Sequence, residues 1–278
     1  MPFNAPKGFK RELQEGRVKI GMFLGSSSIQ LAEVAAFQRI DFLLVDLEHG
    51  ELNDTRSAGE LIRVGDVARK PVIVRVPTNS ADTIGQILDA GAVGICVPHI
   101  RSRRDAEAAV SHAKYSPEGV RAMSPLVRAT RYSAEDWNAS WRTANEEVIV
   151  MAIVEDEEGI ENLEEIAMVP GLDVIWIGVG DLSQDLGVYG ELGHPRVAAA
   201  VERGLRVTIE HGKIAFSGLG GLSADGDLRR ELQAAVGAGF RMFAWVDTVL
   251  VAAAIRQALE AVGGVRDETR LANTSSLP

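Results

Sequence analysis

The chain has 278 residues, of which 46% are apolar, and its formal net charge is −10, from 29 Lys and Arg against 39 Asp and Glu. This length and apolar content suffice for one large barrel or for two domains. No basic stripe interrupts the acidic composition, so nucleic acid is excluded as an expected partner. The N-terminal region has no apolar leader, and no apolar run is long enough to cross a bilayer. We therefore expect a cytoplasmic protein without a membrane partner.

Short apolar runs alternate with segments of helical periodicity along nearly the whole chain. Runs of this kind, bounded by Gly, Pro or acidic residues, are typical of buried parallel strands. The predicted strands are residues 18–25, 41–47, 71–77, 94–100, 148–154, 173–180, 213–218 and 240–246. Eight strands that alternate with helices predict an α/β fold, a single (β/α)8 TIM barrel spanning residues 1–278.

Three segments depart from this alternation. Residues 1–17 are polar and predict a short helix or an N-terminal arm, and residues 266–278 predict a loose tail. Residues 117–147 form a polar, Arg-rich excursion that is too long for an ordinary connection. Long excursions from a regular scaffold are usually lids or subunit contacts. Arg128 and Arg131 in this excursion either bind an anion or are solvated, and the sequence leaves both open.

The most informative stretch is residues 148–183, which predicts one βαβ unit. Its two apolar runs lead to carboxylates, the first to Glu155 and the second to Asp181. Both predicted strands point the same way, so these carboxylates project from neighbouring carboxyl ends, where α/β folds place their sites. Two carboxylates held close together repel, and a hard divalent cation relieves that repulsion. The alternative is that each acid only caps the helix that follows it.

A second group of polar residues follows the predicted strand 41–47, which ends in VDLEHG. Alternation along a strand places Asp46 and Glu48 on one face, with His49 at the start of the loop. A carboxylate beside a histidine fixes its tautomer and lets it take or return a proton near neutral pH. The alternative is that His49 is an ordinary surface or capping residue.

Other polar residues lie in or after apolar strands. Arg75 lies within VIVRV, where a guanidinium is costly unless it is paired or faces a cavity. Its position predicts either that the guanidinium binds a substrate carboxylate or enolate oxygen, or that it forms a buried ion pair with Asp46 or a neighbouring residue. His99, after Pro98, either faces the same barrel mouth or is a plain loop histidine. Glycines in residues 217–227 either cradle a phosphate or form a flexible loop.

The positions of the lysines bear on the reaction. A Schiff-base aldolase needs a desolvated lysine at the carboxyl end of a strand. No lysine of this chain lies at such a predicted position. A metal-dependent enolate mechanism therefore fits the residues better.

With these residues assembled, the chain resembles the HpcH/HpaI aldolase family, the class II metal-dependent pyruvate aldolases that include 4-hydroxy-2-oxoheptanedioate aldolase. The resemblance extends from about Phe23 to Ala261. The segments that carry it are DFLLVDLEHG, PVIVRVP, YSPEGVRAMSPLVRATRY, NEEVIVMAIVEDEEGIENLEEI, DVIWIGVGDLS, GELGHPRV and WVDTVLVAAA. The resemblance implies a barrel of the phosphoenolpyruvate/pyruvate-binding type and a homo-oligomer, with a hexamer as the expected form.

The resemblance also implies a metal site and a carboxylate-binding loop. The family's metal ligands match Glu155 and Asp181, which would hold Mg, Mn or Co. Its GPADLS loop corresponds to GVGDLS here, so that the backbone amides of Gly180 and Asp181 would hold the substrate carboxylate.

The family's catalytic residues can be matched in the same way. Its catalytic histidine matches His49, beside Asp46, and its substrate arginine matches Arg75. The implied reaction cleaves a 4-hydroxy-2-oxo acid to pyruvate or a related 2-oxo acid and an aldehyde, through a metal-bound enolate. The alternatives are an oxaloacetate decarboxylase, an enolate-addition or thioester lyase on the same site, and a non-catalytic binding protein.

Three residues depart from the family's pattern. Ile153 stands where family aldolases often have Gln near the metal, Ala122 replaces a Gly, and Val179 with Gly180 replaces Pro-Ala. None of these changes removes a metal ligand, the histidine or the arginine. We expect them to affect substrate range.

Overall fold

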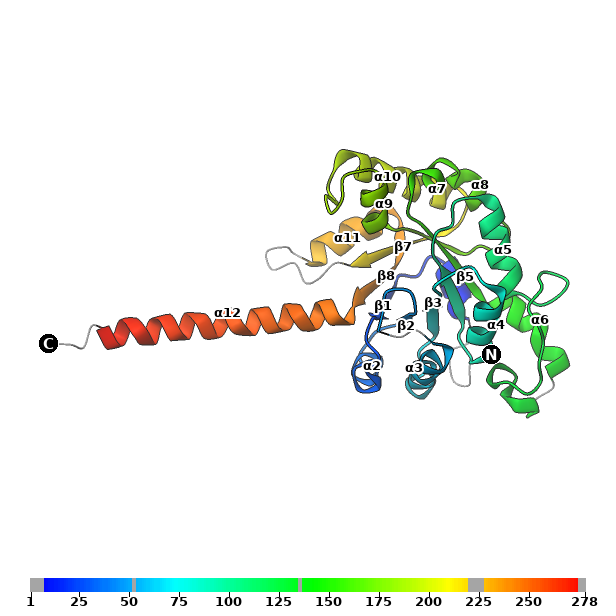
Figure 1. Ribbon diagram of the computed structural model, residues 1–278, viewed down its shortest axis with the longest axis horizontal. Helices are drawn as coiled ribbons and strands as arrows, with labels where there is room; N and C mark the ends of the chain where they lie inside the picture. Colours follow the sequence, from blue (N-terminus) through cyan, green and yellow to red (C-terminus); the bar gives the residue numbers. More distant parts are fainter. Residues whose placement is uncertain (1–7, 52–53, 135–136, 220–227, 275–278) are drawn as a thin grey trace.

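The computed structural model describes residues 8–51, 54–134, 137–219 and 228–274. Eight parallel strands close into a barrel in sequence order, with helices around it, so the predicted (β/α)8 fold is confirmed (Figure 1). Strand pairing runs without a break from β1 with β2 round to β8 with β1. The strands are β1 Lys19–Leu24, β2 Phe42–Asp46, β3 Val72–Arg75, β4 Gly94–Val97, β5 Ile149–Val154, β6 Val174–Ile177, β7 Ile214–Leu219 and β8 Phe240–Val246.

The helices follow the strands in the order that the periodicity predicted, with extra short helices between them. They are α1 Phe9–Gln14, α2 Ile29–Ala36, α3 Thr55–Ala68, α4 Ala81–Asp89, α5 Arg103–Ala113, η1 Arg128–Ser133, α6 Trp137–Glu147, α7 Glu157–Glu161, α8 Leu163–Ala167, α9 Val179–Asp185, α10 Pro195–Glu210, α11 Leu228–Ala238 and α12 Asp247–Thr274. Side-chain caps begin several of them; Ser102, for example, forms a capping box with Asp105 at the start of α5.

The strands bury apolar side chains on both faces, which is why they read as continuous apolar runs. One buried cluster lies between the strands and the surrounding helices, and a second fills the barrel interior. Helix α1, within the predicted N-terminal arm, adds Phe9 and Leu13 to the interior cluster, and the Phe9 ring lies 5.9 Å from that of Phe42. A packed interior leaves the opposite end, where the strands finish, for chemistry.

The central βαβ unit differs in detail from the prediction. Strand β6 ends at Ile177 rather than at Gly180, because the residues after Gly178 turn directly into helix α9. The connecting helix is also divided at Asn162 into α7 and α8. The first difference arises because apolar residues in a short helix give the same local pattern as the end of a buried strand.

The excursion at 117–147 is anchored to the barrel by buried polar contacts. Arg121 donates to Asp89 at 2.7 Å, and Arg128 forms an ion pair with buried Asp66. Asn145 accepts a hydrogen bond from the Tyr115 backbone at 2.8 Å and donates one back at 2.9 Å. Arg128 thus has a structural partner, which favours neither of the two roles that the sequence left open for it.

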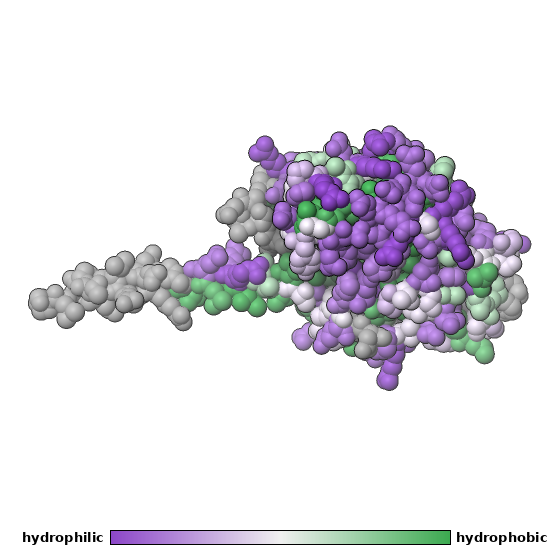
Figure 2. Space-filling view, turned by 45° about the horizontal axis from the view of Figure 1, so that its top comes forward, coloured by the Kyte–Doolittle hydropathy of each residue, from purple (hydrophilic) through white to green (hydrophobic). Residues whose placement is uncertain are grey.

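Helix α12 does not lie along the barrel but projects away from it (Figure 1). Val251, Ile255 and Leu259 lie on one face of it and are exposed by 43%, 55% and 64%. This face is the apolar stripe along the helix in Figure 2. The helix runs to Thr274, through most of the segment expected as a tail. Within the described ranges, no helix is long and apolar enough to cross a membrane.

Candidate active site

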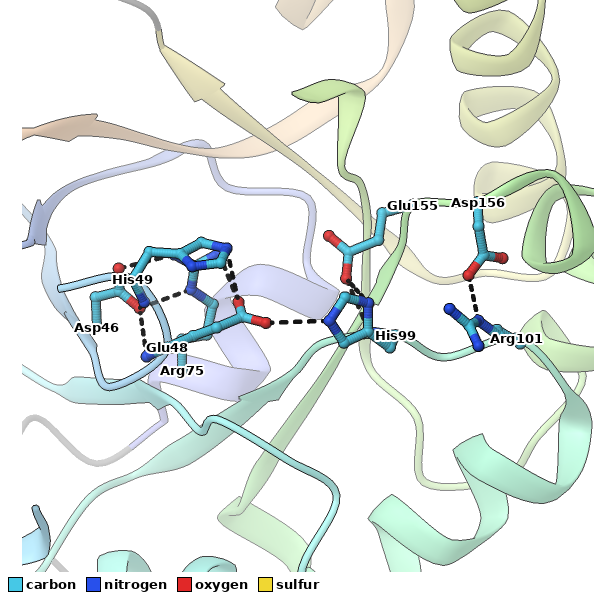
Figure 3. Close-up of polar contacts among 8 residues, drawn as sticks. All are labelled: Asp46, Glu48, His49, Arg75, His99, Arg101, Glu155 and Asp156. Carbon is cyan, nitrogen blue, oxygen red and sulfur yellow. Dashed lines mark hydrogen bonds and ion pairs between the residues drawn. The ribbon is translucent and has the colours of Figure 1, made fainter. Parts of the chain in front are cut away.

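The carboxyl ends of β2 to β5 bring a set of ionisable side chains close together (Figure 3), and two of them, Arg75 and Glu155, line a pocket with Asp181. The pocket has a volume of about 270 Å³. Its lining includes four of the predicted site residues, Arg75, Glu155, Gly180 and Asp181. The glycine-rich segment that was considered for phosphate binding lies for the most part, at 220–227, outside the described residues.

Arg75 and Asp46 form a buried two-point ion pair. Nε of Arg75 donates to Oδ1 of Asp46 at 2.8 Å, and Nη2 donates to Oδ2 at 2.7 Å. The residues are exposed by only 7% and 3%. The guanidinium also lies 5.0 Å from the ring of Phe23 and 5.8 Å from that of Trp176. The two roles predicted for Arg75, substrate binding and a buried ion pair, are thus compatible, since it is paired with Asp46 and still lines the pocket.

Glu48 is the third member of this group. Its Oε2 lies 3.0 Å from Nη1 of Arg75, and its side chain is only 8% exposed. Burial raises the pKa of Glu48, and the nearby Arg75 charge partly opposes that shift. Arg75 therefore faces two carboxylates, and the local charge of this half of the site is negative.

His49 lies outside the pocket lining, beside Glu48, with a side chain that is 61% exposed. Asp46 acts on its backbone rather than on its ring: Oδ1 accepts the backbone N–H of Glu48 at 3.0 Å and, more weakly, that of His49 at 3.4 Å. The ring Nε2 lies 3.8 Å from Oε2 of Glu48. Within the described part of the chain, no ion pair joins the His49 ring to Asp46, because the Arg75 fork occupies that carboxylate.

Glu155 follows the end of β5 and is only 4% exposed. Its Oε1 accepts the backbone N–H of His99 at 2.8 Å. Burial raises the pKa of Glu155, against the lowering effect of the His99 hydrogen bond, and the charges of Glu48 and Asp181 raise it further. A Cβ at Gly178 would lie 2.7 Å from Oε2 of Glu155. Only glycine lets the end of β6 come this close to the carboxylate.

Asp181 lies in the first turn of α9, which begins directly after Gly178. The first amides of a helix have no intrahelical acceptor. The amides of Val179, Gly180 and Asp181 therefore start the helix beside Glu155, at the edge of the pocket. This is the arrangement that a substrate carboxylate would need.

The donor set fits a divalent cation. Glu48 and Glu155 are buried carboxylates whose raised pKa values reflect the cost of holding negative charge there, and Asp181 adds a third negative charge nearby. Glu48, His99 and Glu155 each offer one ligand atom, and these atoms lie within 4.8 Å of one another. Oxygen donors, with one imidazole nitrogen, suit Mg²⁺, Mn²⁺ and Co²⁺ better than thiolate-seeking ions.

Sequence reasoning placed less weight on two residues that the structure brings into the site. Glu48 was assigned to the right strand face but given no role, although its spacing from Asp46 was the available signal. His99 was left open, and it lies beside Glu155. Trp176 was not considered, because a tryptophan inside an apolar strand resembles an ordinary core residue.

The comparisons with known proteins agree with one another. Residues 19–247 match the sequence profile of the HpcH/HpaI aldolase/citrate lyase family. A hydroxypyruvate/pyruvate aldolase of Deinococcus radiodurans is 41% identical over 254 residues, covering 89% of this chain and 87% of the relative. A 4-hydroxy-2-oxo-heptane-1,7-dioate aldolase of Shigella boydii is 36% identical over 209 residues, covering 74% and 78%.

A solved structure gives the same result for the fold. The crystal structure of a family protein from Burkholderia cenocepacia superposes with a TM-score of 0.84 at 30% identity, covering 92% of this chain and 99% of the other. The matched residues include all eight strands and every ionisable residue of the pocket. The chain therefore belongs to the HpcH/HpaI aldolase/citrate lyase family.

Proposed function

We propose that this protein is a divalent-metal-dependent class II aldolase that cleaves a 4-hydroxy-2-oxo acid to a 2-oxo acid and an aldehyde. The reaction class follows from the family and from relatives that are aldolases. The observation that carries the proposal to this chain is the pocket itself, where a buried carboxylate, Glu155, shares one cavity with Arg75 and Asp181. A non-catalytic binding protein would have no need of these buried charges.

Glu155 and Asp181 are the residues that would hold the cation, with Mg²⁺, Mn²⁺ or Co²⁺ as candidates. When bound, a divalent cation supplies Lewis-acid polarisation of the substrate's keto and carboxylate oxygens. The amides of Gly180 and Asp181, at the start of α9, would orient the substrate carboxylate at the same edge of the pocket.

Arg75 stabilises the negative charge that develops on the C2 oxygen as the C3–C4 bond breaks. Its guanidinium is fixed by Asp46 on two nitrogens, so it needs little reorganisation during the reaction. Phe23 and Trp176 enclose it, which lowers the local dielectric and strengthens its electrostatic effect. This role requires a guanidinium held in one orientation rather than a flexible ammonium group such as that of lysine.

His49 is the proposed proton acceptor for the C4 hydroxyl. When that proton leaves, the C4 oxygen forms the aldehyde carbonyl, and the C3–C4 bonding pair moves into the enolate of the 2-oxo acid. Protonation at C3 then completes the product. The exposed ring can exchange its proton with solvent, and Oε2 of Glu48 lies 3.8 Å from its Nε2.

The relatives suggest which 2-oxo acid to test first. One is named for hydroxypyruvate and pyruvate, and another for a 4-hydroxy-2-oxo dicarboxylic acid. We propose that pyruvate or hydroxypyruvate is the enolate-forming partner here. The pocket, of about 270 Å³, is large enough for either of these small acids.

The test is release of 2-oxo acid from a panel of 4-hydroxy-2-oxo acids and from oxaloacetate, with EDTA and with Mn²⁺ added back. Release from hydroxy acids that EDTA stops and Mn²⁺ restores is the expected result. Decarboxylation of oxaloacetate alone would favour the alternative reaction on the same site. Cleavage that persists after complete metal removal would contradict the proposal.

We also propose that the protein is a homo-oligomer, with a hexamer as the expected form. In a (β/α)8 barrel the helix after each strand covers that strand. Here α12 leaves β8, and an apolar groove of about 510 Å³, lined by Ile20, Leu232 and Val236 among others, lies between α11 and strands β1 and β8. The apolar face of α12 from a second copy fits such a groove.

Light scattering coupled to size-exclusion chromatography tests this proposal. Replacing Ile255 and Leu259 together by Glu places two charges on the exposed apolar face. The expected result is a shift of the wild-type oligomer to smaller species. A wild-type protein that is monomeric at micromolar concentration would contradict it.

A further inference from the structure

His99 has an unusual backbone at the end of β4. Its φ is +55°, in the left-handed region that non-glycine residues rarely adopt. This conformation directs its backbone N–H to Oε1 of Glu155 at 2.8 Å, and its ring lies beside the same carboxylate. An observed backbone strain of this kind justifies asking what the side chain does.

The His99 ring lies between two carboxylates (Figure 3). Nδ1 is 3.0 Å from Oε1 of Glu155, and Nε2 is 3.4 Å from Oε1 of Glu48. Within the described residues, both are ion-pair contacts, and the 3.0 Å Nδ1 contact does not have the geometry of a hydrogen bond. Glu48 and Glu155 are only 8% and 4% exposed, whereas the His99 side chain is 52% exposed.

A neutral His99 imidazole cannot donate a hydrogen bond to both Glu48 and Glu155. A neutral ring has one N–H, which can satisfy one of the two carboxylates, and the other ring nitrogen presents a lone pair. A lone pair 3.0 Å from a carboxylate oxygen is repulsive unless a second proton is added to the ring or a metal cation lies against both atoms. The pocket beside them is the one that carries the proposed metal chemistry.

We propose that Nδ1 of His99 is a third protein ligand of the divalent cation, beside Glu155, and that Glu48 is the carboxylate that orients the ring through Nε2. The inference rests on the proposed function, because it concerns the same cation. Metal-binding histidines commonly donate their second N–H to a carboxylate, which fixes the tautomer and the ring orientation. Glu48 is itself held by Arg75 Nη1 at 3.0 Å.

The distances agree with this assignment. Two ligand atoms each about 2.1 Å from one octahedral cation, at a right angle, are about 3.0 Å apart. Nδ1 of His99 and Oε1 of Glu155 have that separation, 3.0 Å. A right-angle pair also explains the direction of the contact, because a nitrogen lone pair aimed at the cation points away from the neighbouring oxygen. Ile153, two residues before Glu155 on β5, is fully buried and apolar and offers no competing ligand.

A nitrogen ligand should change which ions bind best. Imidazole favours Co²⁺ and Zn²⁺ over Mg²⁺, which prefers oxygen donors. His99→Asn keeps a residue that tolerates the left-handed backbone but removes the imidazole. Isothermal titration should give a Co²⁺ affinity at least about 10-fold weaker in His99→Asn, and a smaller change for Mg²⁺. His49→Gln is the matched control, because it removes the other histidine of the pocket, and it should leave both affinities unchanged.

The decisive measurement observes the ligands of the metal directly. Electron spin-echo modulation of Mn²⁺ bound below one equivalent reports a nitrogen nucleus that is coordinated directly. We expect imidazole nitrogen modulation in the wild type and in His49→Gln, its replacement by the ¹⁵N pattern after labelling with [¹⁵N]histidine, and its loss in His99→Asn. Glu48→Gln should weaken Co²⁺ affinity by roughly 10-fold while keeping the nitrogen signal, as a positioning residue would.

The outcomes separate this inference from the function that it rests on. Mn²⁺ that binds, is displaced in Glu155→Gln and shows no nitrogen coupling would overturn the His99 assignment while leaving the aldolase intact. In that case, His99 would be a doubly protonated ring that pairs with both carboxylates. Failure to bind Mn²⁺ at Glu155 at all, together with EDTA-resistant turnover, would overturn the proposed function and the His99 assignment together.

Discussion

The two halves of the pocket differ in how their charges are balanced. On the β2–β3 side, Arg75 and Asp46 form a buried pair with two hydrogen bonds, so the guanidinium is held whether or not a ligand is present. On the β4–β5 side, Glu155 has one backbone hydrogen bond and a misdirected histidine contact, with Asp181 and Glu48 adding like charge. The charge of Asp46 is balanced by Arg75 in the protein alone. The second half lacks a positive charge, and the proposed cation would supply it.

The largest effect on activity should come from removing the negative charge of Glu155, the proposed metal ligand on the β4–β5 side. Glu155→Gln keeps the shape of the side chain but removes its charge, so we expect Mn²⁺ binding to be lost and kcat/KM to fall on the order of 1,000-fold. Calorimetric titration of Mn²⁺ and steady-state kinetics measure the two effects. Circular dichroism of the variant is the control for folding. Wild-type turnover in this variant would remove Glu155 from the site.

Breaking the ion pair on the β2–β3 side should instead reduce stability. Arg75→Met leaves Asp46 buried and unpaired, and removing one partner of a buried ion pair costs about 3–5 kcal/mol. Chemical denaturation should show a loss of this size together with loss of activity. The double variant Asp46→Asn with Arg75→Met should recover much of the stability but none of the activity. If Arg75→Met is as stable as the wild type, the pair is not the structural support that its geometry indicates.

A smaller effect should follow from filling the space between Gly178, after β6, and Glu155, after β5. In Gly178→Ala the added Cβ would lie 2.7 Å from Oε2 of Glu155, so the carboxylate must move. We expect Mn²⁺ affinity and kcat/KM to fall roughly 10-fold, as for a displaced ligand. Gly180→Ala is the matched control, because no atom lies within 4 Å of its Cβ position. Equal effects of the two substitutions would show that helix propensity, not the contact with Glu155, is responsible.

The smallest effect should be a pH dependence of stability that results from the raised pKa of Glu48. Burial raises its pKa in the folded state, so its ionisation opposes folding. Its stabilising contribution is present below the ordinary glutamate pKa and is lost as pH rises through the raised value. With EDTA present, the melting temperature of Glu48→Gln relative to wild type should therefore increase with pH across that interval. A difference that is constant with pH would contradict the raised pKa.

Much of the fold could be predicted from the sequence, because strands buried on both faces give continuous apolar runs. The predicted residues 148–154 contain β5 for this reason, whereas Val179 and Gly180 were assigned to a strand because apolar residues in a short helix look the same. The arrangement within the site was less predictable. Asp46 was expected to orient the His49 ring, but nothing local reveals that Arg75 takes both of its oxygens. The left-handed backbone of His99 likewise has no sequence signal, since glycine or asparagine would be the expected residue there.

The projecting helix α12 has a consequence for how stability should be measured. If a second copy covers the exposed apolar face of α12, as proposed above, the folding equilibrium of the protein includes an association step. By mass action, the melting temperature then rises with protein concentration, and dilution acts as a denaturant. Stability values for this protein would need a stated concentration, as affinities do.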